Sequence, residues 1–408
     1  MAKLKYAVVL GRGIEGCGVT KCAVEFAKYS GAKIFATDDK KWPRRKSISH
    51  DFHEFTVANV AAATRVSEEL NRDFDTVLFF SVPSVTHPVE CQNNFALFIQ
   101  SVKKPKALLQ FDHKSQSIRR NAAFSFICSK MDLLFTHSLD NDFARFLKEK
   151  NVPTKLEKMI LGFDFDSHRE KYWKPIEYQE SKTIRWIGRM SGWKNPVLMM
   201  NFHNQMLRHY GFITILEGLE ASIGYEGILK QKVEGKFVDI DVVNKFRPRA
   251  ERGETKDFEY GAEYPYCAPY LYPPYNNHEC MERMSLSAFG SDLYELPARM
   301  YGNNIENCHA EVVASGAIPI FHKHFTDNIV HNVIGKEVSE CSGSGTISLD
   351  KTTFDEASTL IISLSRTMSK RDEYRNMAFD FWKSHADIKI SHNLIDKKMK
   401  QLIKNKNK

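Results

Sequence analysis

The sequence predicts an α/β protein made of two Rossmann-like domains, each a doubly wound parallel sheet. Three observations support this. Short apolar strands alternate with amphipathic helical segments in the first half, the same alternation resumes after residue 182, and a glycine-rich segment directly follows the first strand. A chain of 408 residues is long enough for two domains with full cores.

The strands of the first domain are expected where short apolar runs stand between polar segments: 6–10, 33–37, 76–82, 107–110 and 132–136. Amphipathic helices are expected at 57–72 and 140–150. Residues 152–182 are rich in Lys, Pro and Tyr and lack clear periodicity, so they are predicted to be a linker.

The second domain repeats the pattern, with strands expected at 183–187, 212–216 and 317–321 and a helix at 306–316. The Tyr- and Pro-rich stretch 260–278 is expected to be an ordered irregular loop. The Lys-rich end, 397–408, is more readily explained as a frayed terminus than as a nucleic-acid contact.

Composition narrows the class of protein. The net charge of +8 is compatible with a polyanionic partner but is weak evidence for one. Eight cysteines without a CxxC pair argue against zinc-ribbon and thioredoxin-like proteins and suggest reduced thiols in a cytoplasm. No apolar run approaches the roughly 18 residues of a membrane span.

The glycine-rich segment GRGIEGCGVTK, at 11–21, has three possible functions. Gly11, Gly13 and Gly16 match the dinucleotide fingerprint of an NAD-binding oxidoreductase, with Asp38 and Asp39 where a ribose-binding acid is expected. A P-loop is disfavoured because Lys21 follows Thr20 instead of preceding it. In the third interpretation, a glycosyltransferase with two facing domains, the loop approaches the sugar and pyrophosphate of a nucleotide donor.

The third interpretation requires nucleotide-binding groups in the second half, and candidates are present. Arg189 and Lys194 follow a strand, where together they can hold a diphosphate and stabilise a leaving nucleoside diphosphate. Glu311, on the helix that precedes the strand at 317–321, can accept hydrogen bonds from both ribose hydroxyls of a uridine diphosphate. Glu306 would face the sugar, although a capping or solvated glutamate is the simpler explanation for this residue alone.

The chain resembles the DNA α-glucosyltransferases of T-even bacteriophages in six motifs that occur in the same order. These are RGIEGCGVTK at 12–21, QFDH at 110–113 with SIRRN at 117–121, RWIGR at 185–189 with WK at 193–194, EGLE at 217–220, MERMS at 281–285 with FG at 289–290, and HxE at 309–311 with GxIP at 316–319. The resemblance implies a GT-B fold, a UDP-sugar donor and no required metal or other cofactor. It also implies retaining transfer to the hydroxyl of 5-hydroxymethylcytosine in duplex DNA.

The resemblance also assigns roles to single residues. Arg189 and Lys194 would hold the pyrophosphate, and Glu311 the ribose. The remaining donor-site residues would be Gly16, Gly18, Phe111, Glu217 and Glu306. Glu25 and Asp112 match acidic active-site positions. Asp112 follows a predicted strand and is the stronger candidate for a base that activates the acceptor hydroxyl, with a helix N-cap as the alternative.

Duplex DNA is the expected macromolecular partner. The basic run 40–46, with Lys40, Lys41, Arg44, Arg45 and Lys46, is a candidate phosphate contact, as are Arg119 and Arg120. A solvated loop would also explain the basic run. Because the active site lies deep between the domains, we expect the target base to be flipped out of the helix.

One position departs from the family pattern, which has His where this chain has Phe111. Phenylalanine cannot hydrogen-bond the exocyclic hydroxyl of glucose, but it could fill the space that a pentose leaves empty. A UDP-pentose such as UDP-arabinose is therefore as plausible a donor as UDP-glucose.

The expected organisation is an N-terminal acceptor domain at 1–165, joined by a C-terminal helix at 385–408, and a UDP-sugar domain at 170–384. The protein is expected to be a monomer in the cytoplasm of an infected host, with no membrane contact. The alternatives are the oxidoreductase, a UDP-sugar transferase with a non-DNA acceptor, and a non-catalytic DNA-binding protein. Asp164, Asp166, Asp239 and Asp241 form Asp-x-Asp pairs that we interpret as loops instead of a metal site.

Overall fold

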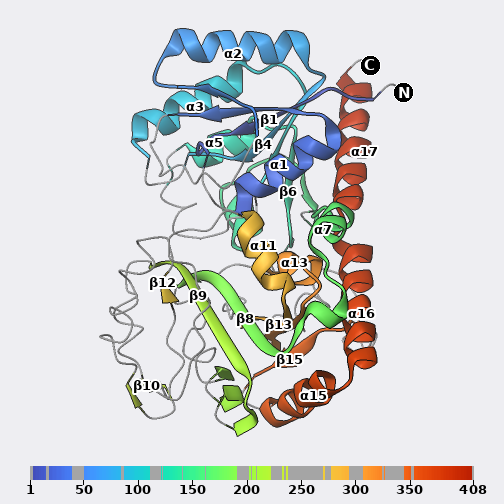
Figure 1. Cartoon of the computed structure of the whole chain (residues 1–408). Coiled ribbons are helices and arrows are strands. Elements are labelled where there is room, and N and C mark those ends of the chain that lie inside the picture. Colours follow the sequence, from blue (N-terminus) through green and yellow to red (C-terminus); the bar gives the residue numbers. More distant parts are fainter. Residues whose placement is uncertain are drawn as a thin grey trace. The chain divides into compact units, whose positions relative to one another are not determined.

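The computed structural model describes residues 3–14, 18–38, 50–83, 87–110, 121, 123–139, 141–160, 162–190, 202–203, 205–207, 209–221, 232–233, 236–237, 270–271, 277–293, 307–323, 326, 344–350 and 353–406. The chain forms two compact units (Figure 1). Unit 1 comprises Met1–Asp164 and His385–Lys408, and unit 2 comprises Phe165–Leu296 and Glu306–Ser384.

Unit 1 is a parallel sheet of order β3-β2-β1-β4-β5-β6-β7, the doubly wound arrangement in which the strand order reverses beside β1. Its strands are β1 Tyr6–Leu10, β2 Lys33–Thr37, β3 Phe52–Phe55, β4 Thr76–Ser81, β5 Lys106–Leu109, β6 Leu133–Thr136 and β7 Leu156–Lys158. Its helices are α1 Gly18–Ser30, α2 Val60–Asp73, α3 Val89–Ser101, α5 Phe124–Ser129, α6 Asp142–Glu149 and α17 Ile388–Lys406.

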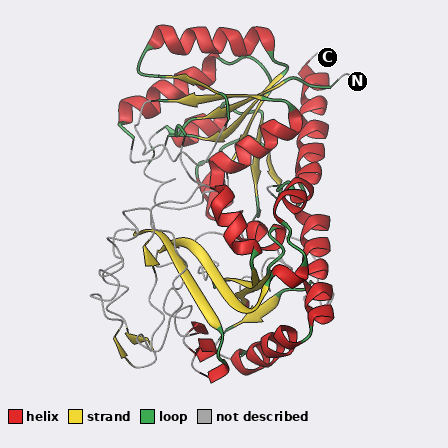
Figure 2. Ribbon diagram, in the orientation of Figure 1, coloured by secondary structure: helices red, strands yellow, loops and turns green. Residues whose placement is uncertain are grey.

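Helices cover both faces of this sheet (Figure 2). Successive strand residues point to opposite faces, so Val9 and Phe79 join a core with α2, α3, α5 and α6, whereas Val8 and Leu78 join a second core with α1 and α17. Burial on both faces explains why β1 and β4 are almost wholly apolar. The strands predicted at 6–10 and 33–37 are confirmed, and the three others are shifted or shortened by one residue.

Unit 2 contains a second parallel sheet, of order β12-β9-β8-β13-β14-β15, and the antiparallel pair β10-β11. Its strands are β8 Glu180–Met190, β9 Ile213–Ala221, β10 Lys232–Val233, β11 Lys236–Phe237, β12 Tyr270–Leu271, β13 Ser287–Asp292, β14 Ile318–His322 and β15 Ile347–Leu349. Its helical elements are α7 Phe165–Tyr172, the 3-10 turn η1 Ile176–Tyr178, α11 Asn277–Ser285, α13 Asn307–Ala314, α15 Phe354–Arg366 and α16 Met368–Ala386.

The predicted linker at 152–182 is wrong, because this segment contains β7, α7, η1 and the start of β8. Asp166 accordingly lies in α7 and pairs with Lys383 instead of lying in a loop. The predicted irregular loop at 260–278 lies mostly outside the described residues, which include only β12 and the first two residues of α11 there.

The expectation of a frayed C-terminus is also wrong. Helix α17 extends to Lys406 and buries Ile388, Ile395 and Met399 against unit 1. The backbone of Phe163 fixes its start, since Phe163 N–H donates to Ala386 O and Ile388 N–H donates to Phe163 O, at 2.9 and 3.0 Å. None of the helices in the described part of the chain combines the length and apolar character that crossing a bilayer requires.

Candidate functional site

The glycine-rich loop begins at the strand-order reversal of unit 1. Gly11 N–H donates to Ser81 O at 3.1 Å, and a Cβ added at Gly11 would lie 2.4 Å from Cζ of Phe95 and 2.7 Å from Ser81 O. Gly13 has a φ of 78°, which favours glycine. The first two glycines therefore let β1 turn sharply against β4. Open crevices at such reversals are where α/β sheets bind ligands.

Gly18 is the first residue of α1, and Gly16 lies outside the described residues. Glu25 lies two turns further along α1, half-buried. Its Oε2 accepts a hydrogen bond from the backbone N–H of Asp164 at 3.1 Å, at the end of unit 1. This contact orients the Glu25 carboxylate within unit 1 and gives it a structural function as well as the expected catalytic one.

Asp38 does not fit the dinucleotide interpretation. It lines a cavity of about 520 Å³ together with residues of β3 and α2, including His53, Glu54, Arg65 and Glu69. None of the residues that line this cavity comes from β1 or from 11–14. The ribose-binding acid of a dinucleotide fold would instead share its pocket with the glycine-rich loop.

Several predicted site residues lie outside the described residues, and for them the sequence-based assignments stay predictions. They are Phe111, Asp112, Arg119 and Arg120 in 111–120, the basic positions Lys40, Lys41, Arg44, Arg45 and Lys46 in 39–49, Lys194, and Glu306. Gln110 is the last described residue before 111–120. It follows β5, is buried, and donates its backbone N–H to Phe135 O at 3.0 Å.

The strand order of unit 2 reverses between β8 and β13. Arg189 is the penultimate residue of β8, and Glu217 lies in the neighbouring β9, where it is paired in register with Ile187. Asp292 is the last residue of β13. The parallel strands thus bring the two predicted donor-site positions and Asp292 toward the same carboxyl edge of the sheet, where nucleotides bind in folds of this class.

Glu311 is half-buried on α13, and close packing fixes this helix. Gly290 permits the approach of α13 to β13, since a Cβ there would lie 2.6 Å from Cγ1 of Val312. Gly316 ends the helix with a φ of 86°, against the ring of Trp173. The predicted helix at 306–316 is therefore confirmed in place, with its described turns at Asn307–Ala314.

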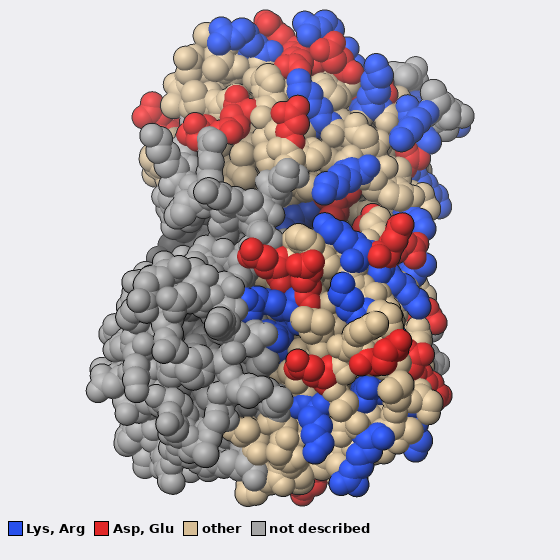
Figure 3. All heavy atoms as spheres, viewed as in Figure 1, with Lys and Arg blue, Asp and Glu red and all other residues tan. Residues whose placement is uncertain are grey.

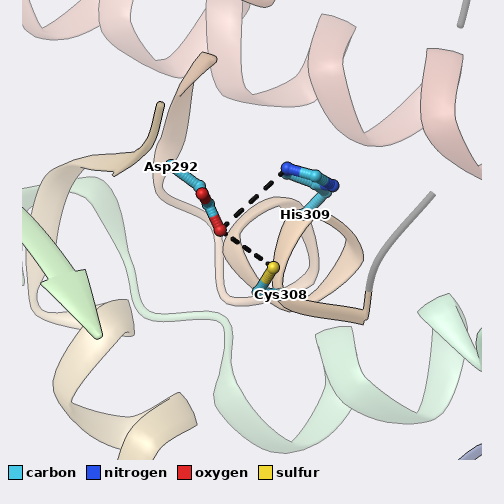
Figure 4. A group of neighbouring side chains, drawn as sticks. All are labelled: Asp292, Cys308 and His309. Atoms are coloured by element: carbon cyan, nitrogen blue, oxygen red, sulfur yellow. Dashed lines mark hydrogen bonds and ion pairs between the residues drawn. The ribbon is translucent and has the colours of Figure 1, made fainter. Parts of the chain in front are cut away.

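A cluster that the sequence did not predict lies at the same edge of unit 2 (Figure 4). Cys308 Sγ donates to Asp292 Oδ2 at 2.9 Å, and His309 Nε2 lies 4.0 Å from the same oxygen. Asp292 is 2% exposed and His309 is fully buried. Sixteen positions separate Asp292 from Cys308, so only the packing of α13 on β13 could have revealed the cluster.

Another histidine of unit 2 is structural. His203 is fully buried, and its Nε2 lies 2.8 Å from Ser291 Oγ on β13. Burial lowers the pKa of His203 to about 3, because the charged imidazolium would lose its hydration. The ring is therefore neutral near pH 7.

Charge on the described surface is mixed. On the face drawn in Figure 3, lysines and arginines are interspersed with aspartates and glutamates over both units. Several lysines of α17 are held in ion pairs, such as Lys398 with Glu157 and Lys406 with Asp132, each at 2.7 Å. The expected DNA contacts at 40–46, Arg119 and Arg120 lie outside the described residues, so they stay predictions from the sequence.

Two doubly wound parallel sheets, each with a reversal of strand order, are the architecture of the GT-B class of glycosyltransferases. Solved structures agree: a trehalose-6-phosphate enzyme of E. coli bound with UDP-2-fluoro glucose matches 97% of this chain and 99% of its own at a TM-score of 0.57 and 11% identity, which supports the fold.

The particular family follows from closer relatives. The family model described as DNA alpha-glucosyltransferase matches residues 17–369. The DNA alpha-glucosyltransferase of Enterobacteria phage T4 is 26% identical over 403 residues, which cover 94% of this chain and 96% of the relative. The chain belongs to the DNA alpha-glucosyltransferase family, as its motifs indicated, and is therefore an enzyme that glycosylates DNA.

Solved structures of similar proteins carry both expected ligands. An alpha-glucosyltransferase in complex with UDP matches 97% of this chain and 100% of its own, at a TM-score of 0.82 and 25% identity. An alpha-glucosyltransferase in complex with UDP and a 13-mer DNA containing an HMU base matches 98% and 100%, at a TM-score of 0.81 and 25% identity. The oxidoreductase alternative is excluded by the family of the chain.

Proposed function

We propose that this protein transfers a sugar, with retention of configuration, from a UDP-sugar to the hydroxyl of 5-hydroxymethylcytosine in duplex DNA. The observation that carries the proposal is the family match over residues 17–369. A similar enzyme was solved with UDP and DNA that contains an HMU base, and this supports a hydroxymethylated pyrimidine as the acceptor.

Unit 2 is the proposed UDP-sugar domain, and its carboxyl edge is the proposed donor site. Glu311 would accept hydrogen bonds from the ribose hydroxyls, which fits its half-buried position on a helix that is closely packed against β13. Arg189 and Lys194 would hold the diphosphate and stabilise the departing UDP without a metal. Glu217 and Glu306 would complete the site beside the nucleotide and the sugar.

Unit 1 is the proposed acceptor domain. A target base would be flipped out of the duplex, since enzymes that modify a base take it out of the stack to reach it. Asp112 would accept the proton of the attacking hydroxyl, and Glu25 would add negative charge beside the developing positive charge on the sugar. The phosphates of the duplex would be contacted by the basic run 40–46 and by Arg119 and Arg120.

The proposal also concerns the identity of the transferred sugar. Phe111 stands where the family has His, and it favours a pentose over glucose because it offers no hydrogen bond to an exocyclic hydroxyl. The substitution would be neutral if glucose binds without that hydrogen bond. We further propose that the enzyme acts as a monomer in the cytoplasm of an infected bacterial host.

Acceptor-dependent release of UDP tests the proposal. The protein is incubated with UDP-glucose or UDP-arabinose and with matched duplexes that contain either cytosine or 5-hydroxymethylcytosine. We expect UDP release only with the hydroxymethylated duplex. Release at the same rate with the cytosine duplex would indicate donor hydrolysis, and release only with a non-DNA acceptor would support the alternative transferase. A protein that binds DNA but gives no thermal shift with UDP would be a non-catalytic binder.

A further inference from the structure

The cluster of Asp292, Cys308 and His309 contains three different metal-ligating side chains, and all point toward one another in unit 2 (Figure 4). The carboxylate oxygen, the thiol sulfur and the ring nitrogen lie within 4.8 Å of one another. Among the described residues, this is the one group of three or more such ligands. It lies where β13 ends and α13 begins.

The spacing suits a small tetrahedral cation. Bonds of about 2.0–2.3 Å to Zn²⁺ in a tetrahedron place the ligand atoms roughly 3.4–3.6 Å apart. Here the sulfur and the carboxylate oxygen are 2.9 Å apart, and His309 Nε2 is 4.0 Å from that oxygen. Side-chain movements of up to about 1 Å would therefore bring all three atoms to bonding positions.

Charge and burial favour the same cation. Asp292 and His309 are buried, whereas Cys308 is half-buried and leaves one side of the group accessible. A thiolate and a carboxylate together neutralise a divalent cation, so the occupied site would carry no net charge in a buried setting. Thiolate and imidazole ligands select Zn²⁺ over the harder Mg²⁺ and Ca²⁺.

We propose that Asp292, Cys308 and His309 bind one Zn²⁺ ion, with water in the fourth position. Binding releases the thiol proton of Cys308 to solvent and replaces its hydrogen bond to Asp292 with bonds from both side chains to the metal. The ion would tie the end of β13 to the first turn of α13, the helix that carries Glu311. The inference rests on the geometry of the cluster and is independent of the proposed function.

The test is a titration of the reduced full-length protein with Co²⁺, which replaces Zn²⁺ and reports thiolate ligation through a sulfur-to-cobalt charge-transfer absorption. The variants are Cys308→Ser and Asp292→Asn. Cys280→Ser is the matched control, because Cys280 is also a half-buried cysteine of unit 2 and is not part of the cluster. Circular dichroism checks that each variant is folded, and Zn²⁺ competition gives the affinity.

We expect one equivalent of Co²⁺ and the charge-transfer band in the wild type and in Cys280→Ser. Cys308→Ser should lose the band, and Asp292→Asn should bind at least about tenfold more weakly, since even an outer-shell partner contributes roughly 10- to 100-fold. A wild type without the band would overturn the proposal and leave a hydrogen-bonded cluster. A band that survives in folded Cys308→Ser would overturn it as well, because another cysteine would be the ligand.

Discussion

The backbone N–H of Asp164 donates a hydrogen bond to the Glu25 carboxylate, with 3.1 Å between the nitrogen and Oε2. This contact joins the first helix of unit 1 to the last described residues before unit 2. It gives Glu25 a structural function in unit 1, beside the catalytic function that we propose for it.

Glu25→Gln should separate these functions. The amide oxygen of Gln can still accept from Asp164, so the thermal midpoint should change little, whereas the loss of negative charge should lower kcat about 100-fold or more. Glu25→Ala should lose both the rate and part of the stability. Steady-state kinetics and thermal unfolding measure the two effects, and a Gln variant with the wild-type rate would remove Glu25 from the chemistry.

Gly11→Ala should destabilise the protein by about 1–3 kcal/mol, because the new Cβ overlaps Phe95 and Ser81 O. The substitution Phe95→Leu replaces the ring by a smaller side chain and should relieve part of this overlap. Urea unfolding of the two single variants and the double variant measures the coupling. We expect the double variant to lose less than the sum of the singles, and additive losses would show that the Phe95 ring is not the obstacle.

Glu311→Gln should weaken UDP binding about 10- to 100-fold, the range that follows from losing a hydrogen bond to a charged acceptor. Calorimetric titration with UDP measures the change. Glu356→Gln is the matched control, because Glu356 is exposed on α15 of the same unit and should leave the affinity unchanged. Equal UDP affinity in both variants would contradict the ribose assignment.

His203 should make the protein acid-sensitive. Its folded pKa is about 3, below the ordinary 6.5, so the unfolded chain binds a proton between these pH values while the native state does not. The stability contributed by neutral His203 is therefore lost as the pH falls, by about 2 kcal/mol between pH 7 and pH 5. Denaturant unfolding at both pH values should show this extra loss in the wild type relative to His203→Gln. If the wild type and His203→Gln lose the same free energy of unfolding between pH 7 and pH 5, His203 is not a buried neutral histidine.

Phe111→His should raise the ratio of kcat/KM for UDP-glucose over UDP-arabinose by about 2- to 10-fold, the effect of one restored hydrogen bond. Phe111→Leu is the control, since it stays apolar and should leave glucose use unimproved. Competition between the two donors gives the ratio directly. A His variant that gains no glucose transfer would count against the steric argument.

The sequence predicted the elements with the clearest patterns. β1 and β4 are almost continuous apolar runs, so their strands were found within a residue. β7 was missed because its three residues are only half-buried, and α7 was missed because only Phe165 and Tyr172 of its eight residues are buried. The C-terminal helix was predicted at 385–408 and is found as α17 at Ile388–Lys406, but the many lysines of its last turns led to the wrong expectation of a frayed end at 397–408.

The same distinction holds for the site. The place of Glu311 on a helix was predictable because this helix, the glycine that ends it and the following strand are contiguous in the sequence. The contact of Glu25 with Asp164 spans 139 positions. The cluster of Asp292, Cys308 and His309 depends on the absence of a side chain at Gly290. Neither has a local sequence signal, because each is created by tertiary packing.

Mass spectrometry of nucleosides tests the central claim most directly. Duplex DNA containing 5-hydroxymethylcytosine is incubated with the protein and either UDP-glucose or UDP-arabinose, then digested to nucleosides. We predict a 5-hydroxymethyl-2′-deoxycytidine nucleoside heavier by one hexose or one pentose residue, and the added mass identifies the sugar. Unmodified nucleosides with both donors, from protein that binds UDP, would contradict the assignment of the acceptor or of the sugar.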